Sequence, residues 1–277
     1  MNEIVCNAAA ASLAGAIQIS IFNPLDCLRV RWQVAGQMDA SFAQFAISLV
    51  RNEGWWRGLH SVGLGFNQVA VGVSQGLRMG MYPTVRDSLI RDGGSVTPAA
   101  MATAGLVSGS LGYLVSAPVW LLKTRSHVAA QKGTIIEWPT RLSGLWLGCG
   151  PLVVRGALLT AGQMVGYDGT KRVCTRHQIL SDGPRMHVLA ATAAAFSAST
   201  VSAPADVVWT RLQSSEAHQP GGAPSLTSCV ASIWRQGGIG GFYRGWTANV
   251  MRMAPTFIVG TTIYEQTRHL LGIGYLT

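Results

Sequence analysis

The sequence predicts an all-α membrane protein, with six transmembrane helices in three pseudo-threefold repeats and short helices at the membrane surface. Only 12% of the 277 residues are charged while 48% are hydrophobic, a balance that is unusual for a soluble globular domain. Six apolar stretches are long enough to cross the hydrocarbon core of a bilayer, which takes about 20 residues. A proline motif recurs near the ends of the first, third and fifth stretches, at Pro24, Pro118 and Pro204. Its spacing of roughly a third of the chain indicates an internal triplication.

The expected spans follow one another in order, two in each repeat. They cover residues 4–32, 62–89, 99–129, 152–173, 186–213 and 246–271, and the repeats cover residues 1–92, 93–181 and 182–277 of one transmembrane domain. Several spans exceed the length needed to cross the bilayer, so we expect them to tilt and to kink at each interior proline. Small residues four positions apart, such as Gly105 and Gly109, predict close packing of helices in lipid.

Short amphipathic segments between the paired spans predict helices that lie at the membrane surface. In the first and third repeats, residues 41–51 and 226–236 carry apolar residues at helical spacing. In the second repeat, Trp138-Pro139 interrupts the corresponding segment. The surface helix of that repeat is therefore expected to be shortened or absent.

Other features of the sequence disfavour several classes of protein. The net charge of +9 includes no dense run of lysine and arginine, so we expect no nucleic-acid partner. Five widely spaced cysteines without a Cys-x-x-Cys pair predict reduced thiols and no metal site. His177 and Asp182 have the spacing of an acyltransferase motif, but they lie in a polar connector, and we expect no enzyme. The remaining histidines, His187 among them, lack ligand spacing and are expected in solvated or helix-end positions.

Charged residues follow the three prolines at fixed offsets on one helix face. A charge within a membrane span is costly unless it is paired or faces water. An acid and a base one turn apart on three helices therefore predict a ring of ion pairs between helices, which would act as a gate. The residues at these positions are Asp26, Arg29, Trp120, Lys123, Asp206 and Trp209.

The even-numbered spans carry a second motif, in which an aromatic residue precedes an acid and a base. Its first copy has Pro83 where the acid belongs. The other residues of the motif are Arg86, Tyr167, Asp168, Lys171, Tyr264, Glu265 and Arg268.

These repeats and motifs resemble the mitochondrial carrier family over essentially the whole chain. The resemblance implies a multi-pass, monomeric solute carrier of the mitochondrial inner membrane that works by alternating access. It assigns the first ring of charges to a matrix gate and the second to a cytoplasmic gate. The matrix-gate pairs that it implies are Asp26–Lys123, Asp206–Arg29 and Trp120–Trp209, with Gln33 and Gln213 as braces.

The two tryptophans depart from the family's pattern together. Losing one member of a pair would leave a buried charge without a partner, whereas two aromatic rings can pack against each other. We therefore expect Trp120 and Trp209 to form an apolar plug in this sector of the gate. The alternative is that each tryptophan anchors its helix at the lipid interface. With two ionic pairs where three are possible, we expect a lower barrier and some net uniport.

The resemblance also implies lipid sites at the surface loops of the first and third repeats. Bound cardiolipin is the one structural cofactor that it suggests. The residues expected to hold this lipid are Trp56, Arg57, Gly58, Tyr243, Arg244 and Gly245.

The substrate site is expected near the middle of the bilayer, between the two gates. Arg155 and Arg252 stand 13 residues before the acids of the last two cytoplasmic motifs, about 20 Å away along an α-helix. Arg78 adds a third cation. All 12 acids fall in gate motifs, loops or helix ends, so we expect no carboxylate in the middle of the cavity beside these arginines. They then select small anions, because guanidinium binds carboxylate and sulfate oxygens in bidentate fashion. The alternative is that the arginines only pair with helix carbonyls or with the gate acids. The remaining residues of the expected site are Ser74, Gln75, Gly156 and Gln163.

Finer resemblance narrows the substrate. Residues 155–168 and 252–268 are similar to dicarboxylate and oxaloacetate carriers, which implies small dicarboxylates of the oxaloacetate or malate type, with sulfate as a further candidate. Arg155-Gly156 stands where nucleotide carriers have a glycine followed by an aliphatic residue, which disfavours adenine nucleotides. Two alternatives remain: an uncoupling-type carrier of protons or anions, and a receptor that has the carrier fold without transporting.

Overall fold

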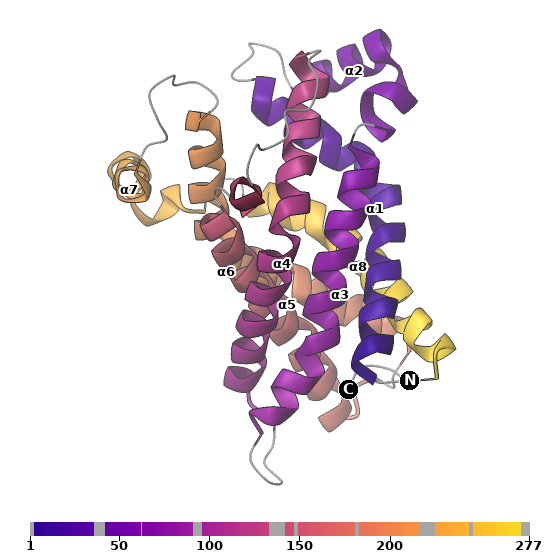
Figure 1. Cartoon of the computed structure of the whole chain (residues 1–277). Coiled ribbons are helices and arrows are strands. Elements are labelled where there is room, and N and C mark those ends of the chain that lie inside the picture. The colour runs from indigo at the N-terminus through magenta and orange to yellow at the C-terminus, as the bar shows by residue number, and fades with distance from the viewer. Residues whose placement is uncertain are drawn as a thin grey trace.

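Six long helices form the body of the protein in the computed structural model (Figure 1), which describes residues 3–35, 42–61, 63–90, 96–132, 142–146, 149–180, 183–216, 225–243 and 246–272. The long helices are α1 (Glu3–Ala35), α3 (Leu64–Ser88), α4 (Pro98–Lys132), α5 (Cys149–Arg176), α6 (Pro184–Glu216) and α8 (Trp246–Leu270). Each begins and ends within three residues of an expected span. The described residues contain no strand, and the all-α prediction is confirmed.

The six long helices close into a ring. Each of α1, α3, α4 and α5 packs against the next long helix along the chain, α6 packs against α8, and α8 returns to pack against α1. Both chain termini lie at the same end of this ring, and the short helices α2 (Phe42–Glu53) and α7 (Leu226–Gly241) lie toward the other end (Figure 1). Three helix pairs therefore surround one central axis.

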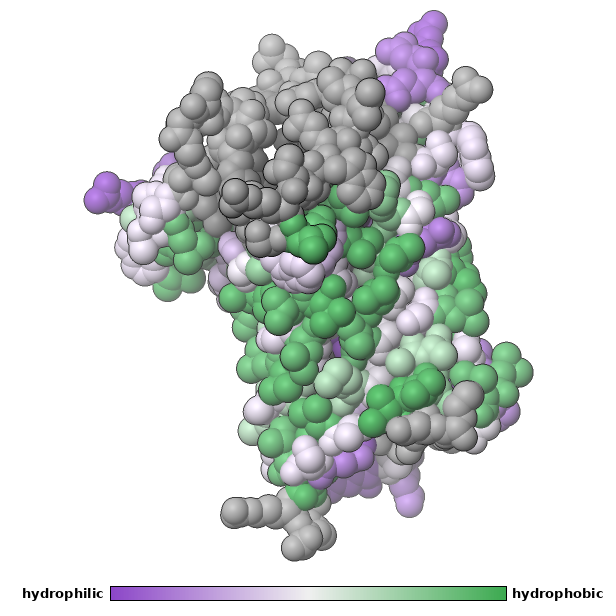
Figure 2. Space-filling view, viewed as in Figure 1, coloured by the Kyte–Doolittle hydropathy of each residue, from purple (hydrophilic) through white to green (hydrophobic). Residues whose placement is uncertain are grey.

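The distribution of apolar and polar side chains is that of a membrane-embedded protein. On α1, Leu13, Ile17, Ile21 and Leu25 follow one another at four-residue intervals and are all exposed. The buried residues of the long helices are mostly small or polar, with alanine prominent among them. Hydrophobic residues cover the middle of the visible face, and hydrophilic ones gather toward its ends (Figure 2). Apolar residues outside and small or polar ones inside are what helix packing in a bilayer requires.

Three described stretches are long and apolar enough to cross a membrane by composition alone. They are Ile4–Leu28, Pro98–Ser126 and Pro184–Trp209, in α1, α4 and α6. The other three long helices have similar lengths but carry inward-facing charges such as Arg78 and Asp168, both of which are buried. These charges lower the average hydropathy of their helices. Since the charges face inward, the outer face of each helix still points toward lipid. The three repeats therefore supply six transmembrane helices.

Small residues bring neighbouring helices into close contact, as the sequence predicts. A Cβ atom on Gly105 of α4 would lie 2.6 Å from Ala161 Cα of α5, and one on Gly162 would lie 2.8 Å from Ala198 Cα of α6. No side chain fits at these glycines unless the helices move apart. The Gly162–Ala198 contact fixes how α5 and α6 align, and this alignment decides which charges meet.

The surface segments differ between repeats. Helices α2 and α7 occupy the two segments where surface helices are expected. In the second repeat, residues 133–141 lie outside the described chain, and a short 3₁₀ helix, η2 (Leu142–Trp146), follows them. A π-helical turn, η1 (Trp56–His60), connects the first surface helix to α3. The sequence analysis did not anticipate this turn.

Candidate functional site: two polar gates and the arginines between them

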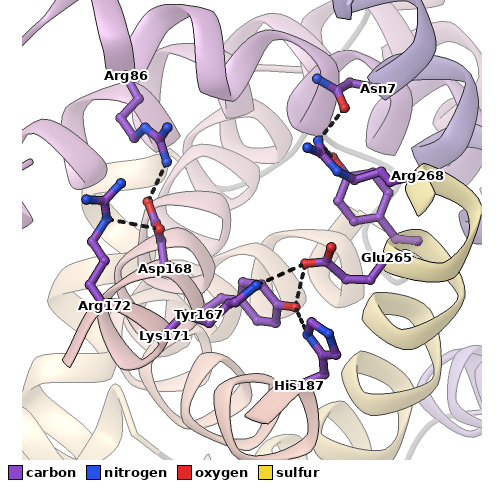
Figure 3. A network of polar contacts seen from close by, with 10 residues as sticks. Asn7, Arg86, Tyr167, Asp168, Lys171, Arg172, His187, Glu265 and Arg268 are labelled. Carbon is purple, nitrogen blue, oxygen red and sulfur yellow. Dashed lines mark hydrogen bonds and ion pairs between the residues drawn. The ribbon is translucent and has the colours of Figure 1, made fainter. Parts of the chain in front are cut away.

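Residues expected at the cytoplasmic gate surround Asp168 of α5, which is 1% exposed. Its Oδ2 accepts hydrogen bonds from Arg86 Nη1 and from the Tyr82 hydroxyl, both at 3.0 Å. Its Oδ1 lies 3.2 Å from Arg172 Nε, one turn further along α5. Figure 3 shows the two guanidinium groups pointing at this one carboxylate. The carboxylate therefore joins α3 to α5 through a buried, fully partnered ion pair.

A second buried carboxylate joins α5 to α8. Glu265 accepts a 2.8 Å hydrogen bond from the Tyr167 hydroxyl, and Lys171 Nζ lies 3.8 Å from its Oε1. The Tyr167 hydroxyl also lies 3.0 Å from His187 Nδ1 at the start of α6 (Figure 3). His187 is only 2% exposed and is therefore not solvated, although it lies in the first turn of α6, at a helix end as expected. It is held inside the bundle because a tyrosine hydroxyl reaches its ring.

In the third sector of this expected gate, the described partners of the base are neutral groups. Pro83 occupies the acid position on α3, and Arg268 of α8 instead hydrogen bonds to Asn7 Oδ1 on α1 (Figure 3). A second hydrogen bond runs from Arg268 Nη1 to the Tyr264 hydroxyl, at 3.2 Å. Asn7 and Arg268 are 2% and 4% exposed. A neutral amide therefore takes the place of the missing acid, from a helix that carries no copy of this motif.

The matrix gate contains the first of its expected ion pairs. Lys123 Nζ of α4 lies 2.6 Å from Asp26 Oδ2 of α1. The same oxygen accepts a 3.2 Å hydrogen bond from Asn67 of α3, so this carboxylate joins three helices. The side chains of Arg29, Gln33 and Gln213 lie outside the described part of the chain, and with them the expected Asp206–Arg29 pair.

The two tryptophans of the matrix gate enter one apolar cluster. Both pack, partly buried, against Tyr113, Ala117 and Leu152. The Trp120 ring stacks on Tyr113 with 6.0 Å between ring centroids, and Lys123 Nζ lies 4.7 Å from the Trp120 ring centre. This surrounding suits the expected apolar plug better than a lipid-interface anchor, because the rings face other helices.

The expectation that no carboxylate lies beside Arg155 is wrong. Its Nε forms an ion pair with Asp206 Oδ1 of α6, a carboxylate that also accepts a 3.0 Å hydrogen bond from Ser202. Helix register explains the encounter. Seven residues back from Gly162 and seven on from Ala198, the antiparallel helices bring Arg155 level with residue 205. A gate acid on one helix and a substrate arginine on its neighbour therefore share one depth.

The other two arginines have neutral partners. Arg252 Nη2 donates a 2.9 Å hydrogen bond to Asn249. Arg78, which is 4% exposed, donates a 3.0 Å hydrogen bond to the Thr160 hydroxyl and lies over the Tyr113 ring, 5.2 Å from its centre. Arg78 Nε is buried without a hydrogen-bond acceptor among the described residues. Arg78 thus carries a buried charge that no described carboxylate balances.

The remaining residues of the expected substrate site lie at helix interfaces. Ser74 donates to the Val71 carbonyl of its own helix, and Gln75 donates a 3.2 Å hydrogen bond to Gln18 of α1. Gln163 is buried, and its Oε1 has no partner among the described residues. Gln75 and Gln163 both line a small pocket that Gln18 and Thr261 also line. Gly156 lies under the Tyr113 ring, which leaves no room there for a side chain.

The expected lipid-binding residues are only partly described. The Trp56 side chain is 62% exposed and that of Tyr243 is 40% exposed, whereas Gly58 is buried in the π-helical turn. The Arg57 side chain and residues 244–245 lie outside the described chain.

A closed ring of three helix pairs, joined by buried ion pairs between its helices, has the architecture of a membrane carrier. The chain belongs to the mitochondrial carrier protein family, whose description matches residues 2–93, 94–178 and 181–274. It is accordingly a solute transporter of the mitochondrial inner membrane.

Three relatives show the breadth of this similarity. The chain is 30% identical to the mitochondrial substrate carrier family protein ucpB of Dictyostelium discoideum, with 95% of this chain and 94% of the relative covered. It is 28% identical to the mitochondrial brown fat uncoupling protein 1 of Rattus norvegicus, covering 92% and 89%. It is 26% identical to the mitochondrial oxaloacetate transport protein of Saccharomyces cerevisiae, covering 95% and 88%.

Sequence reasoning missed several residues that the structure brings into these networks, among them Asn67, which bonds to Asp26. Asn7 and His187 were single polar residues near the starts of apolar helices, and no spacing connected either to a motif. Arg172 directly follows the motif lysine and adds a second base to Asp168. Tyr113 lies amid an apolar run on α4. The one available signal was that buried polar groups need partners, which says nothing about which partner.

Proposed function

We propose that this carrier transports small dicarboxylate anions, of the oxaloacetate or malate type, by alternating access. The observation that carries the proposal is the set of inward-facing arginines on three different helices: Arg78 on α3, Arg155 on α5 and Arg252 on α8. Arg78 lies in the bundle with only neutral hydrogen-bond partners among the described residues. A buried guanidinium is costly unless an anion balances it. An anion with two carboxylates fits a site that offers more than one arginine.

The Arg155–Asp206 pair supports a specific way of coupling substrate to gate. Since Asp206 belongs to the matrix gate, a substrate carboxylate that binds Arg155 replaces the Asp206 carboxylate on the same guanidinium. The substrate thereby supplies the interaction that the gate loses, so Arg155 is never left as an uncompensated buried charge. Removing one partner from a buried pair costs about 3–5 kcal/mol, and this exchange avoids most of that cost.

Alternating access also requires that each gate can open, and this depends on the contacts within the two gates. Among the described residues, the cytoplasmic gate holds ion pairs at Asp168 and at Glu265 and one arginine–amide bond, and the matrix gate holds Asp26–Lys123, Arg155–Asp206 and the tryptophan cluster. Buried ion pairs are weak because desolvation opposes their attraction. Gates of this kind can therefore open at a cost that substrate binding offsets, and we infer that each opens in turn.

We further propose that the protein acts as a monomeric transporter and not as an enzyme, without a nucleic-acid partner. Exposed aromatic residues at the surface turns, including Trp56 and Tyr243, support sites for a structural lipid such as cardiolipin. Tryptophan and tyrosine favour this interfacial depth because one side of the ring is apolar and the other is wet.

A second candidate function is uncoupling-type conduction of protons or anions. It is favoured by the similarity to brown fat uncoupling protein 1 over 92% of this chain. The two candidates differ in what they move, so one preparation of proteoliposomes can separate them.

The test is uptake of labelled malate, oxaloacetate, sulfate, phosphate and ADP by proteoliposomes that contain the purified protein, with proton flux measured alongside. Arg155→Ala should abolish saturable dicarboxylate uptake. Arg176→Ala is the matched control, because it removes an arginine from the exposed end of the same helix and should leave uptake unchanged.

Three other outcomes of the uptake experiment would contradict the proposed dicarboxylate transport. Uptake of ADP in preference to malate would exclude dicarboxylates as the substrate class. Proton flux without dicarboxylate uptake would favour the uncoupling function. No uptake of any anion by folded protein would favour a receptor that does not transport.

A further inference from the structure

Four side chains form one continuous stack beside α4. The Arg78 guanidinium lies 5.2 Å from the Tyr113 ring centre. The Tyr113 and Trp120 rings are stacked, with 6.0 Å between centroids and 29° between planes. Lys123 Nζ lies 4.7 Å from the Trp120 ring centre and 2.6 Å from Asp26. The stack therefore runs from an arginine of the proposed substrate site to an ion pair of the matrix gate.

Helix geometry and two glycines fix this arrangement. Tyr113 and Trp120 are seven residues apart, which places them two turns apart on one face of α4. A Cβ atom on Gly112 would lie 2.6 Å from Arg78 Cγ, and one on Gly156 would overlap the Tyr113 ring. The absence of side chains at these two positions leaves the space that Arg78 and Tyr113 fill. Tyr113 is only 5% exposed, so its ring has few other positions to occupy.

Each contact in the stack depends on its neighbours. A cation is attracted to the face of an aromatic ring most strongly where water is excluded, and both ends of this stack carry one. The Tyr113 ring contacts both the Arg78 guanidinium and the Trp120 ring. When the guanidinium turns toward an anion, it leaves the Tyr113 ring, and the rings beyond it lose their packing on that side.

We propose that Tyr113 is a positioning residue that couples the substrate site to the matrix gate. Binding of a carboxylate at Arg78 releases Tyr113, Trp120 follows the ring on which it stacks, and Lys123 is drawn away from Asp26. This proposal rests on the proposed function, since it takes a small carboxylate anion as the ligand at Arg78. It also assigns a role to Trp120, which replaces an acid of the family's gate with a ring that holds Lys123 from the other side.

The test is a double-mutant cycle between Tyr113→Leu and Trp120→Leu, measured by the KM for labelled malate and by the melting temperature in detergent. With Tyr113 present, Trp120→Leu should change KM by about 3- to 10-fold, the range expected for loss of one or two ring contacts. In the Tyr113→Leu background, the same change should shift KM by less than about twofold, because the link is already broken. Tyr113→Phe, which keeps the ring, should behave as the unaltered protein.

The outcomes separate this inference from the proposed function. If malate is transported but the two KM effects simply multiply, Tyr113 does not couple the sites, and the inference is wrong while the function stands. If Tyr113→Phe disturbs KM as much as Tyr113→Leu, the hydroxyl matters and the ring stack does not carry the effect. If no anion is transported, the proposed function fails, and additive melting-temperature shifts would then also refute the stack as a unit.

Discussion

Arg155 of α5 and Asp206 of α6 form an ion pair that links the proposed substrate site to the matrix gate. Their side chains are 13% and 14% exposed, so the pair lies inside the bundle. The gate carboxylate and the substrate therefore compete for one guanidinium group. This competition leads to the first prediction.

Asp206→Asn should lower the KM for dicarboxylate uptake by about 3- to 10-fold, because the substrate no longer competes with a resident carboxylate for Arg155. It should also lower the melting temperature, since removing one partner of a buried pair leaves the other charge uncompensated, at about 3–5 kcal/mol in the extreme case. Uptake kinetics and a thermal melt check the two effects. Glu53→Gln, at an exposed carboxylate of α2, is the control and should change neither. An unchanged or higher KM in Asp206→Asn would rule out the exchange of carboxylates on Arg155.

Asn7→Leu should destabilise the protein, because it leaves the buried Arg268 guanidinium without the Asn7 acceptor. The expected loss is about 1–3 kcal/mol, which amounts to several degrees in melting temperature. Asn7→Asp should do the opposite, because it completes a third ionic pair, and it should slow transport by making this gate harder to open. The melt can be followed through labelling of cysteines that are buried in the folded state, such as Cys6 and Cys174.

Pro83→Asp should rescue stability in the same sector of the cytoplasmic gate, around Arg268. It places a carboxylate where the motif of the other repeats has one, and in the Asn7→Leu background it should restore part of the lost stability. If Asn7→Leu melts at the same temperature as the unaltered protein, Asn7 is not the third acceptor of this gate.

Trp120→Asp combined with Trp209→Arg should slow net uniport relative to exchange. The two changes replace the apolar cluster with a third ionic pair in the matrix gate, which raises the cost of opening the gate without substrate. Trp120→Asp alone should be destabilising, since it places a carboxylate among Tyr113, Ala117 and Leu152. Uniport and exchange rates in the same proteoliposomes check the effect, and the idea fails if both rates stay unchanged in the double variant.

Gly156→Ala should destabilise the protein although it adds a single methyl group. That methyl would overlap the Tyr113 ring, and overpacking of this kind typically costs about 1–3 kcal/mol. Gly169→Ala is the matched control on the same helix, because a Cβ there would meet nothing within 4 Å. It should be neutral or slightly stabilising, since alanine favours helix over glycine by about 1 kcal/mol. Equal melting temperatures for the two variants would show that Tyr113 does not lie over Gly156.

The sequence by itself determined the helices and the class of protein. Apolar runs about as long as a bilayer is thick, with prolines repeating every third of the chain, predicted all six spans to within three residues of their ends. They could do so because span length and helix periodicity are local properties that the membrane imposes on each segment separately. The Asp26–Lys123 pair was also foreseen, because the resemblance to the carrier family implied which acid faces which base.

Only the tertiary structure decided which charges meet. Asp206 reaches Arg155 because the contact of Gly162 with Ala198 sets the register of α5 against α6, and no local pattern encodes that register. Asn7 reaches Arg268 because α8 returns to α1 and closes the ring, which brings the two ends of the chain together. Hydrogen bonds and ion pairs depend on distances between atoms of separate helices, so these partners are fixed by packing and not by the spacing of residues along the chain.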